Sequence, residues 1–371
     1  MDTTRPLGLY IHIPFCKAKC AYCDFYSLAH GEARMDACAA ALAASLRAAA
    51  PDAAGYTVDT VYFGGGTPSY FGASRLAALL SVVTESFCVA PDAEITLEAN
   101  PESARDGSAL RTLRAAGFNR ISLGMQSADA GELRAVGRVH TAQDTEAAVE
   151  AARAAGFDNL SLDLIYGLPS QTAERWRASL AAAVALAPEH LSCYGLKIEP
   201  GTPLDARRET LELPDDDAQA ELYLDAVSFL AARGYGQYEI SNFARPGRES
   251  RHNLKYWTLG EYLGFGPGAH SDFGGRRFAV ARDLDSFLAG NAVCGENAAI
   301  PPRERAAERV MLGLRLARGL PADELAGAEA VLRACEAHGL AEQTGVRWRL
   351  TPRGFLVSNA IILRVQEALG L

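Results

Sequence analysis

The most informative stretch of the chain is a repeat: LRAAGFNRISL at Leu113–Leu123 returns 39 residues later as ARAAGFDNLSL at Ala152–Leu162. A weaker copy, LAARGYGQYEI, spans Leu230–Ile240. In each copy an alanine- and arginine-rich run, typical of a helix, ends at a glycine, which suits the left-handed position that caps many helices. An apolar run typical of a buried strand follows. The repeated unit is therefore helix, glycine, strand.

Further apolar runs extend this alternation along the first two thirds of the chain. Alternating strand and helix patterns imply a parallel sheet with helices on its outside, an α/β fold. Six such units predict an incomplete (β/α)6 barrel; a doubly wound open sheet is the alternative, because periodicity does not separate the two. The strand candidates are Leu9–Ile13, Thr60–Phe63, Glu94–Glu98, Arg120–Leu123, Leu160–Ile165 and Leu191–Leu196, and the helix candidates are Ala33–Ala50, Ser74–Phe87, Gly107–Ala116, Ala142–Ala155, Ala173–Leu186 and Asp216–Ala232.

The composition changes after about residue 245 and predicts three regions. Residues 1–245 form the barrel, and residues 246–295, first polar and aromatic and then glycine-rich, form a connecting segment. Residues 296–371 form a small, mostly helical domain, because PPRERAAERVMLGLRLARGL predicts a proline-initiated amphipathic helix and RWRL a short strand before a closing helix. This arrangement is winged-helix-like. A winged helix often binds DNA, but no basic cluster lies along a sustained helix face here.

Charge and composition set the expected partners and compartment. The 371 residues carry a net charge of −9, and an acidic chain is a poor candidate for binding nucleic acid. The start of the chain lacks a basic segment followed by a long apolar run, so we expect no signal peptide. Charged and polar residues interrupt the alanine-rich stretches, so membrane contact is peripheral at most. We expect a cytoplasmic protein whose thiols stay reduced.

Three of the eight cysteines fall within eight residues, as CxxxCxxC directly after the first predicted strand: Cys16, Cys20 and Cys23. Thiolates are the natural ligands of iron–sulfur clusters. Three of them hold a [4Fe–4S] cluster and leave one iron open, and an open coordination position distinguishes reactive from structural metal sites. A structural zinc site is the alternative, but it needs a fourth ligand, and paired CxxC spacing is absent.

The CxxxCxxC segment resembles the signature of the radical S-adenosylmethionine (SAM) superfamily. The resemblance implies that the amino and carboxylate groups of SAM chelate the open iron. Reduction of the cluster then cleaves SAM to a 5′-deoxyadenosyl radical. Tyr22, directly before the third cysteine, matches the residue that contacts adenine in that superfamily.

Further polar residues fall at the carboxyl ends of predicted strands, the edge that carries the active site of a barrel. The glycines of Gly64–Pro68 (GGGTP) allow a ligand to approach the backbone. Glu98 can accept both ribose hydroxyls, and Gln126 offers an amide to a polar ligand. Arg138 can pair with a carboxylate through its planar fork. Asp163 stands in an apolar strand and needs partners there. Each residue alone could also be a structural cap or an ion pair.

Four longer segments resemble the group that contains oxygen-independent coproporphyrinogen III dehydrogenase and the heme chaperone HemW family. They are LYIHIPFC from Leu9, GFNRISLG from Gly117, DLIYGLP from Asp163 and GPGAHS from Gly266, and the resemblance covers residues 7 to about 365. It implies cluster ligands at Cys16, Cys20 and Cys23. The SAM contacts that it implies are Tyr10, Gly65, Gly66, Thr67, Glu98, Gln126, Arg138 and Asp163.

Three features favour the chaperone family over the dehydrogenase. The dehydrogenase pattern has a further cysteine two residues after the third, where this chain has Phe25. The dehydrogenase has a substantial extension before its first strand, whereas in this chain the first predicted strand begins by residue 9. His252–Trp257 reads HNLKYW and matches the HNxxYW segment of the chaperones. We therefore expect a protein that binds heme and transfers it to an acceptor hemoprotein, with respiratory hemoproteins as the candidate class.

The rival function is an enzyme that oxidises coproporphyrinogen III through the deoxyadenosyl radical. A radical SAM enzyme with another substrate is the weakest of the three hypotheses. Phe25 and the early first strand argue against the dehydrogenase, but the sequence leaves open whether SAM is cleaved in function and therefore whether the protein is an enzyme.

The HNxxYW segment also supplies a candidate heme contact. Histidine is a common axial ligand of heme iron, and Tyr256 and Trp257 offer flat apolar faces to a macrocycle. His252 is therefore a candidate heme-binding residue, with His270 as its rival. The alternative is that His252 makes hydrogen bonds inside the protein while the aromatic side chains fill the core. No CxxCH motif for covalent heme attachment is present.

Overall fold

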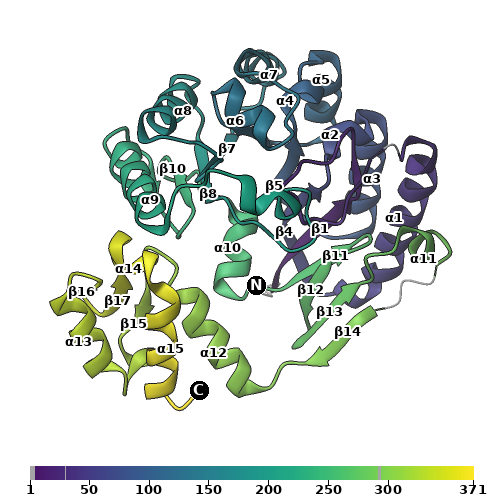
Figure 1. The fold of residues 1–371 in the computed structure, drawn as a ribbon. Helices are drawn as coiled ribbons and strands as arrows, with labels where there is room; N and C mark the ends of the chain where they lie inside the picture. Colours follow the sequence, from purple (N-terminus) through teal and green to yellow (C-terminus); the bar gives the residue numbers. More distant parts are fainter. Residues whose placement is uncertain (1–4, 30, 291–293) are drawn as a thin grey trace.

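The computed structural model describes residues 5–29, 31–290 and 294–371, and six parallel strands pair in chain order at its centre (Figure 1). All six predicted strands and all six predicted helices are present. Because neighbours in the sheet are consecutive in this series, the strand order never reverses as it does in a doubly wound sheet. The α/β fold with an open, incomplete barrel is thus confirmed. The strands are β1 (Arg5–Ile13), β4 (Tyr56–Gly65), β5 (Val89–Ala99), β6 (Arg120–Gln126), β7 (Leu160–Tyr166) and β8 (His190–Gly195), and the helices are α1 (Met35–Ala49), α3 (Ala73–Ser86), α5 (Gly107–Ala116), α7 (Ala142–Ala154), α8 (Ala173–Ala185) and α9 (Asp216–Ala231).

The repeated glycines end helices as the sequence predicts. Gly117 after α5 has φ 118° and Gly156 after α7 has φ 93°, a backbone conformation that other residues rarely adopt. The residue after each glycine, Phe118 or Phe157, donates its backbone N–H to the carbonyl oxygen five positions back and buries its ring. This is the hydrogen-bond pattern of a Schellman cap. The repeat therefore encodes a helix stop, an anchoring aromatic ring and the start of the next strand.

The third copy of the repeat keeps the cap but not the strand. Gly234 ends α9 with φ 83°, yet only Gly236–Gln237 (β9) follows, and it pairs antiparallel with β10 (Asn242–Ala244). The chain turns back because the buried Glu239 carboxylate accepts hydrogen bonds from the backbone N–H of Ser241 and from the Asn242 side chain. The third copy, already the weaker one in sequence, therefore does not add another parallel strand.

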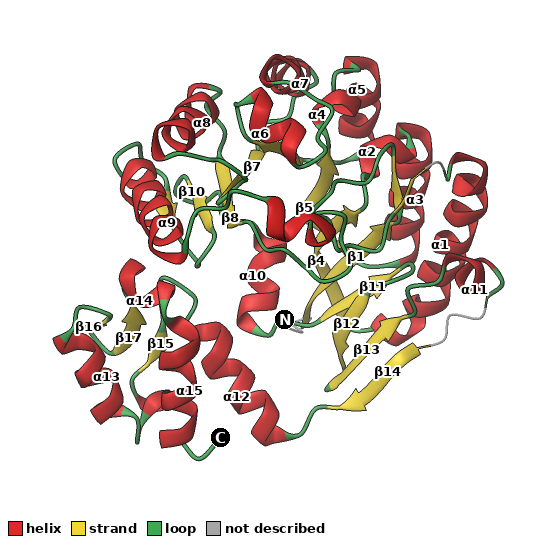
Figure 2. Ribbon diagram, viewed as in Figure 1, coloured by secondary structure: helices red, strands yellow, loops and turns green. Residues whose placement is uncertain are grey.

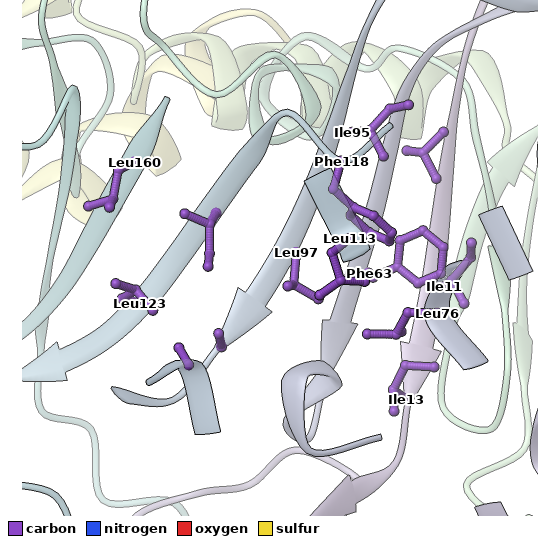
Figure 3. Close-up of a cluster of buried hydrophobic side chains, with 14 of the residues drawn as sticks. Ile11, Ile13, Phe63, Leu76, Ile95, Leu97, Leu113, Phe118, Leu123 and Leu160 are labelled. Atoms are coloured by element: carbon purple, nitrogen blue, oxygen red, sulfur yellow. The ribbon is translucent and has the colours of Figure 1, made fainter. Parts of the chain in front are cut away.

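Side chains alternate along the strands between an apolar outer face and a polar inner face. Figure 3 shows the outer layer, in which Ile11, Phe63 and Leu97 of three adjacent strands are fully buried between the sheet and the helices. Residues of the opposite parity, such as Glu98 and Ser122, face the concave interior of the barrel and line its cavity. The interior of this barrel is therefore suited to a polar ligand.

Strands between residues 262 and 299 extend the sheet on the other side of β1. Strand β11 (Tyr262–Phe265) pairs parallel with β1, and β12 (His270–Phe273), β13 (Arg276–Val280) and β14 (Cys294–Ala299) follow antiparallel. Gly266 shows why this region is glycine-rich, because a Cβ atom there would lie 2.5 Å from the carbonyl oxygen of His12. The domain boundaries at 245 and 295 stay predictions.

Helix α10 (Arg251–Thr258), which contains the whole HNxxYW segment, packs inside the arc of strands (Figure 1). Its first backbone N–H groups, those of Arg251 and His252, donate to the Glu94 carboxylate of β5 at 3.1 and 3.0 Å. The buried Lys255 pairs with Asp59 of β4 at 2.7 Å. These contacts at the first and last turns of α10 hold the helix against β4 and β5. The helix fills the barrel interior near the amino ends of the strands, and the carboxyl ends remain open to a ligand.

The C-terminal region forms a separate core of helices and a small antiparallel sheet, as the sequence predicts (Figure 2). Trp348 is 2% exposed at its centre, packed with Leu332 and Val365. The predicted amphipathic helix, short strand and closing helix are all present. The elements are α12 (Pro302–Gly313), β15 (Leu320–Pro321), α13 (Glu329–Ala337), β16 (Ala341–Thr344), β17 (Arg347–Leu350), α14 (Pro352–Leu356) and α15 (Ser358–Ala368).

Candidate functional site

A cavity of about 450 Å³ opens at the carboxyl ends of the central strands. It collects residues from distant parts of the chain that the sequence singled out, and Tyr10 and His252 are the two members of the predicted site that it does not include. Since the carboxyl ends of parallel strands carry the sites of barrel proteins, the position agrees with the expectation. The predicted residues that line it are Cys16, Cys20, Tyr22, Cys23, Gly65, Gly66, Thr67, Glu98, Gln126, Arg138 and Asp163.

The cysteine loop follows β1 and is tied to the barrel on two sides. Phe15–Cys16 (β2) pairs with Leu28–Ala29 (β3), so that the loop returns to its starting point. At its middle, the Ala21 N–H donates to the Val136 carbonyl at 3.0 Å, and the Ala21 carbonyl accepts from the Leu204 N–H at 2.8 Å. The three cysteines are therefore held on an anchored loop.

The donor set fits an iron–sulfur cluster better than a single ion. Burial raises the pKa of the Cys16 and Cys23 thiols, and the neighbouring cysteines raise it further, so the three sulfur atoms interact electrostatically. Three cysteine thiolates are ligands of the kind that an iron–sulfur cluster takes, whereas a structural zinc site takes four protein ligands.

The GGG segment positions Cys16 as well as lining the cavity. The backbone N–H of Gly66 donates to the carbonyl of Ile13, and that of Thr67 donates to the carbonyl of Phe15, both at 2.8 Å. A Cβ atom on Gly66 would lie 2.7 Å from the Phe15 carbonyl oxygen. The Thr67 hydroxyl also donates to the Cys16 sulfur at 3.4 Å. The glycine is thus required for a backbone contact that sets the start of the cysteine loop.

Glu98 is held with one oxygen on a side chain and the other on the backbone. The Tyr62 hydroxyl donates to its Oε1 at 2.7 Å, and the Gly65 N–H donates to its Oε2 at 3.1 Å. Burial raises the pKa of Glu98 to about 7, although these two hydrogen bonds oppose the shift. The carboxylate is therefore pre-oriented for hydroxyl donors from a ligand.

Arg138 brings a buried cation to the cavity wall. Its guanidinium donates to the Asn100 side-chain oxygen at 2.6 Å and to the Tyr22 hydroxyl at 3.0 Å. Its buried Nε has no hydrogen-bond partner among the described residues. Gly124 makes room for this arrangement, because a Cβ atom there would lie 3.2 Å from an Arg138 nitrogen. A free buried donor beside a cavity fits an anionic group such as a carboxylate.

Asp163 and Gln126 complete the predicted wall. The Ser122 hydroxyl lies 3.1 Å from both carboxylate oxygens of Asp163, which supplies the partner that the sequence required. Burial raises the pKa of Asp163. Gln126 lies in the left-handed region with φ 63°, a strained conformation for this residue type. This conformation occurs at the last residue of β6, and the Gln126 side chain lines the cavity.

The structure does not bring His252 and Tyr10 into the cavity. The two ring nitrogens of His252 lie 2.9 Å from the Thr60 hydroxyl and 2.8 Å from the Tyr256 hydroxyl, and the ring is stacked on Tyr62. Burial lowers the pKa of His252 to about 3, so the ring is neutral. Tyr10 packs beside them, with its hydroxyl 3.0 Å from His12 Nδ1. This placement favours the alternative of a hydrogen-bonded core histidine. The HNxxYW segment does reach the cavity, through Asn253.

Several lining residues were missed by the sequence reasoning, and Arg120 is the most unusual. It is 1% exposed at the floor of the cavity, and its Nε has no hydrogen-bond partner among the described residues. A charged residue at the first position of an otherwise apolar predicted strand was the available signal. Asn100 and Asn253 gave no such signal, because asparagine is common in turns and caps. Tyr62, Ser122, Ser192 and Tyr194 are among the other lining residues that were missed.

In the described part of the chain, no helix is both long enough and apolar enough to cross a membrane.

The sequence pattern of the Radical SAM superfamily matches residues 10–183, and that of the HemN C-terminal domain matches residues 300–357.

Curated relatives match nearly the whole chain. The heme chaperone HemW of Mycobacterium tuberculosis is 41% identical over 370 residues, which cover 96% of this chain and 94% of the relative. The heme chaperone HemW of Escherichia coli (strain K12) is 42% identical over 266 residues, 71% and 70% of the two chains. Among solved structures, the coproporphyrinogen III oxidase HemN from Escherichia coli, a radical SAM enzyme, matches with a TM-score of 0.84 and 26% identity over 98% of this chain and 92% of its own.

Proposed function

The chain belongs to the HemW family of the radical SAM superfamily, and from this premise we propose that it is a heme chaperone, which binds heme and passes it to an acceptor hemoprotein. The observation that carries the proposal is the 41% identity to a heme chaperone over 96% of the chain. The structurally similar oxidase shares only 26% identity. A respiratory hemoprotein is the proposed class of acceptor.

The proposal includes a resident [4Fe–4S] cluster on Cys16, Cys20 and Cys23. Such a cluster, when bound, supplies an open iron to SAM and an electron to its sulfonium. The chain itself contributes an anchored loop and a threonine hydroxyl beside the Cys16 sulfur. A Cys20→Ser variant should lose the cluster's iron and its charge-transfer absorbance, whereas Cys88→Ser, at an exposed free cysteine, should keep both. Retention of iron by the Cys20 variant would refute the assignment.

The cavity wall is the proposed SAM site. Glu98, oriented by Tyr62 and the Gly65 N–H, accepts hydrogen bonds from the ribose hydroxyls. Arg138, a buried cation in the cavity wall, pairs with the SAM carboxylate. Tyr22, whose hydroxyl accepts from Arg138, offers its ring to adenine. The remaining proposed contacts are Tyr10, Gly65, Gly66, Thr67, Gln126 and Asp163, of which Tyr10 acts from behind the cavity wall.

His252 remains a proposed contributor to the heme site, but the contacts support an indirect role. As an axial ligand, its ring would have to leave Thr60 or Tyr256 and turn out of the core. Where it lies, it packs on Tyr62, which in turn holds Glu98. We therefore favour a positioning role for His252.

Oxidation of coproporphyrinogen III is the second candidate function, because the oxidase has the same fold over 98% of this chain. Two measurements on a single protein preparation distinguish the two candidate functions. The cluster is reconstituted without oxygen, heme is titrated by its absorbance, and coproporphyrinogen III consumption is measured with SAM and a reductant present. The chaperone proposal predicts saturable heme binding without product. Steady formation of protoporphyrinogen would contradict it.

A further inference from the structure

Four side chains that line the cavity are not among the proposed SAM contacts. We call Lys19, Phe25, Tyr194 and Lys197 the mouth cluster. Phe25 is 65% exposed and Tyr194 is 41% exposed, which is unusual for large aromatic residues in the described chain, and both lysines are exposed. An exposed aromatic pair flanked by two cations has the composition of a binding site rather than of a solvated loop.

The two halves of the mouth cluster come from loops that are fastened together. Lys19 and Phe25 lie on the cysteine loop, whereas Tyr194 and Lys197 lie at the end of β8 and just after it. The loop after β8 returns across the barrel, where the Leu204 N–H donates to the Ala21 carbonyl at 2.8 Å. A smaller cavity of about 270 Å³ lies at this junction, between Lys19 and Cys23 on one side and Pro200–Pro203 on the other. The mouth cluster is therefore a fixed rim beside the cluster cysteines.

The charge at this rim departs from that of the whole chain. The chain carries −9 overall and has only four lysines, yet Lys17, Lys19 and Lys197 are three of them. The acids nearby are already paired: Glu199 with Lys197 at 2.6 Å and Asp24 with Arg282 at 3.9 Å. Among the residues that the structure describes, the Lys19 ammonium donates only to the Phe25 carbonyl, at 3.3 Å. Lys19 has no acidic partner within salt-bridge distance among the described residues, so its charge is available to an anionic ligand, whereas such a ligand would compete with Glu199 for Lys197.

We propose that the mouth cluster is the heme-binding site, with the macrocycle against the Phe25 and Tyr194 rings and the two propionates toward Lys19 and Lys197. This inference rests on the proposed chaperone function and assigns its cargo to named residues. A porphyrin has wide apolar faces and two carboxylates on one edge, and the rim offers aromatic faces between two ammonium groups. Heme at the rim also leaves the inner wall, with Glu98 and Arg138, to SAM.

The test uses the full chain with its cluster reconstituted. Heme affinity is measured by absorbance titration for the wild type, Lys19→Glu, Lys197→Glu and Phe25→Ala, with heme and with heme dimethyl ester, whose propionates carry no charge. Lys17→Glu is the matched control: the same charge reversal on the same loop, at a residue that does not line the cavity. Iron content and SAM affinity are recorded for every variant. Lys197 lies outside the cysteine loop, so Lys197→Glu still tests the proposal if Lys19→Glu fails to assemble the iron–sulfur cluster.

The wild type should prefer heme over its ester, and each lysine reversal should weaken heme binding about fivefold while leaving ester binding unchanged. Phe25→Ala should weaken both ligands about tenfold. Lys17→Glu should match the wild type, and SAM affinity should be unchanged throughout. If all rim variants bind heme like the wild type, the mouth assignment is overturned while the chaperone function stands. If the wild type itself binds no heme, both are overturned.

Discussion

At the scale of single residues, the spacing of chemistry-bearing side chains predicted most of the site, and burial decided the rest. CxxxCxxC and the strand-end positions of Glu98 and Gln126 are visible in the sequence alone, because the carboxyl ends of parallel strands meet in the fold. Arg120 was missed because its role depends on the polar inner face of the sheet, which only the fold reveals. His252 was ambiguous for the same reason: only the packing of α10 shows that both ring nitrogens are occupied.

The raised pKa of Glu98 gives a residue-scale prediction. Burial raises it to about 7, so the acceptor carboxylate is lost as the pH falls below that value. SAM affinity should be constant above pH 7 and fall by up to about tenfold per pH unit below it. Calorimetric titration with SAM at pH 6 and pH 8 checks this, and Glu98→Gln should bind weakly and equally at both. Equal wild-type affinity at the two values would remove Glu98 from the ribose contact.

At the scale of elements, strand and helix positions followed the sequence closely because the repeat itself contains the residues that end each helix. The Gly117 and Gly156 caps and the aromatic ring after each place the helix ends. Contacts between elements far apart in the sequence were harder to predict. The sheet extension from β11 and the seat of α10 inside the barrel depend on contacts between residues such as Asp59 and Lys255, far apart in sequence, that leave no periodic signal.

The hydrogen bonds between the GGG segment and the cysteine loop predict that Gly66→Ala disturbs both folding and cluster assembly. Its Cβ atom would lie 2.7 Å from the Phe15 carbonyl oxygen, so the backbone must shift. We expect a loss of about 1–3 kcal/mol in the free energy of unfolding and a lower iron content after reconstitution. Gly236→Ala, with its nearest atom at 3.9 Å, is the control and should behave like the wild type. Full iron content in Gly66→Ala would show that the contact does not position Cys16.

The contacts of α10 predict that His252→Ala destabilises the protein without removing heme. The variant loses two hydrogen bonds and a stacked ring, which should cost about 2–4 kcal/mol of unfolding free energy. Heme affinity should stay within about twofold of the wild-type value, because His252 itself does not line the cavity. Thermal unfolding and heme titration on the same sample measure both. A stable variant that has lost heme would instead make His252 a ligand.

At the scale of the whole molecule, the barrel and the C-terminal region meet at the turn between β9 and β10. The Ile240 N–H donates to the Arg315 carbonyl and the Ala317 N–H to the Tyr238 carbonyl. Glu239, fully buried between them, holds the turn with its carboxylate. The two regions are thus joined through a buried acid, which neither the composition change near residue 245 nor the repeat could predict.

This junction makes stability depend on pH. Burial raises the pKa of Glu239 from 4.5 to about 7. Between these values the folded chain keeps a proton that the unfolded chain has lost, so the free energy of unfolding falls as pH rises, by up to about 3 kcal/mol from this group. Glu239→Gln, which cannot ionise, should gain thermal stability relative to the wild type between pH 5 and pH 8. A difference that does not change with pH would mean that Glu239 is ionised in the fold throughout.

The central claim is that this chain delivers heme, and transfer measures it most directly. The heme-loaded protein, with its cluster in place, is mixed with the heme-free form of a b-type respiratory hemoprotein, and the acceptor's absorbance is followed in time. The account predicts that the acceptor fills faster from the loaded protein than from the same concentration of free heme, and that the loaded protein loses its heme in step. Filling no faster than from free heme, or retention of heme by the loaded protein, would contradict it.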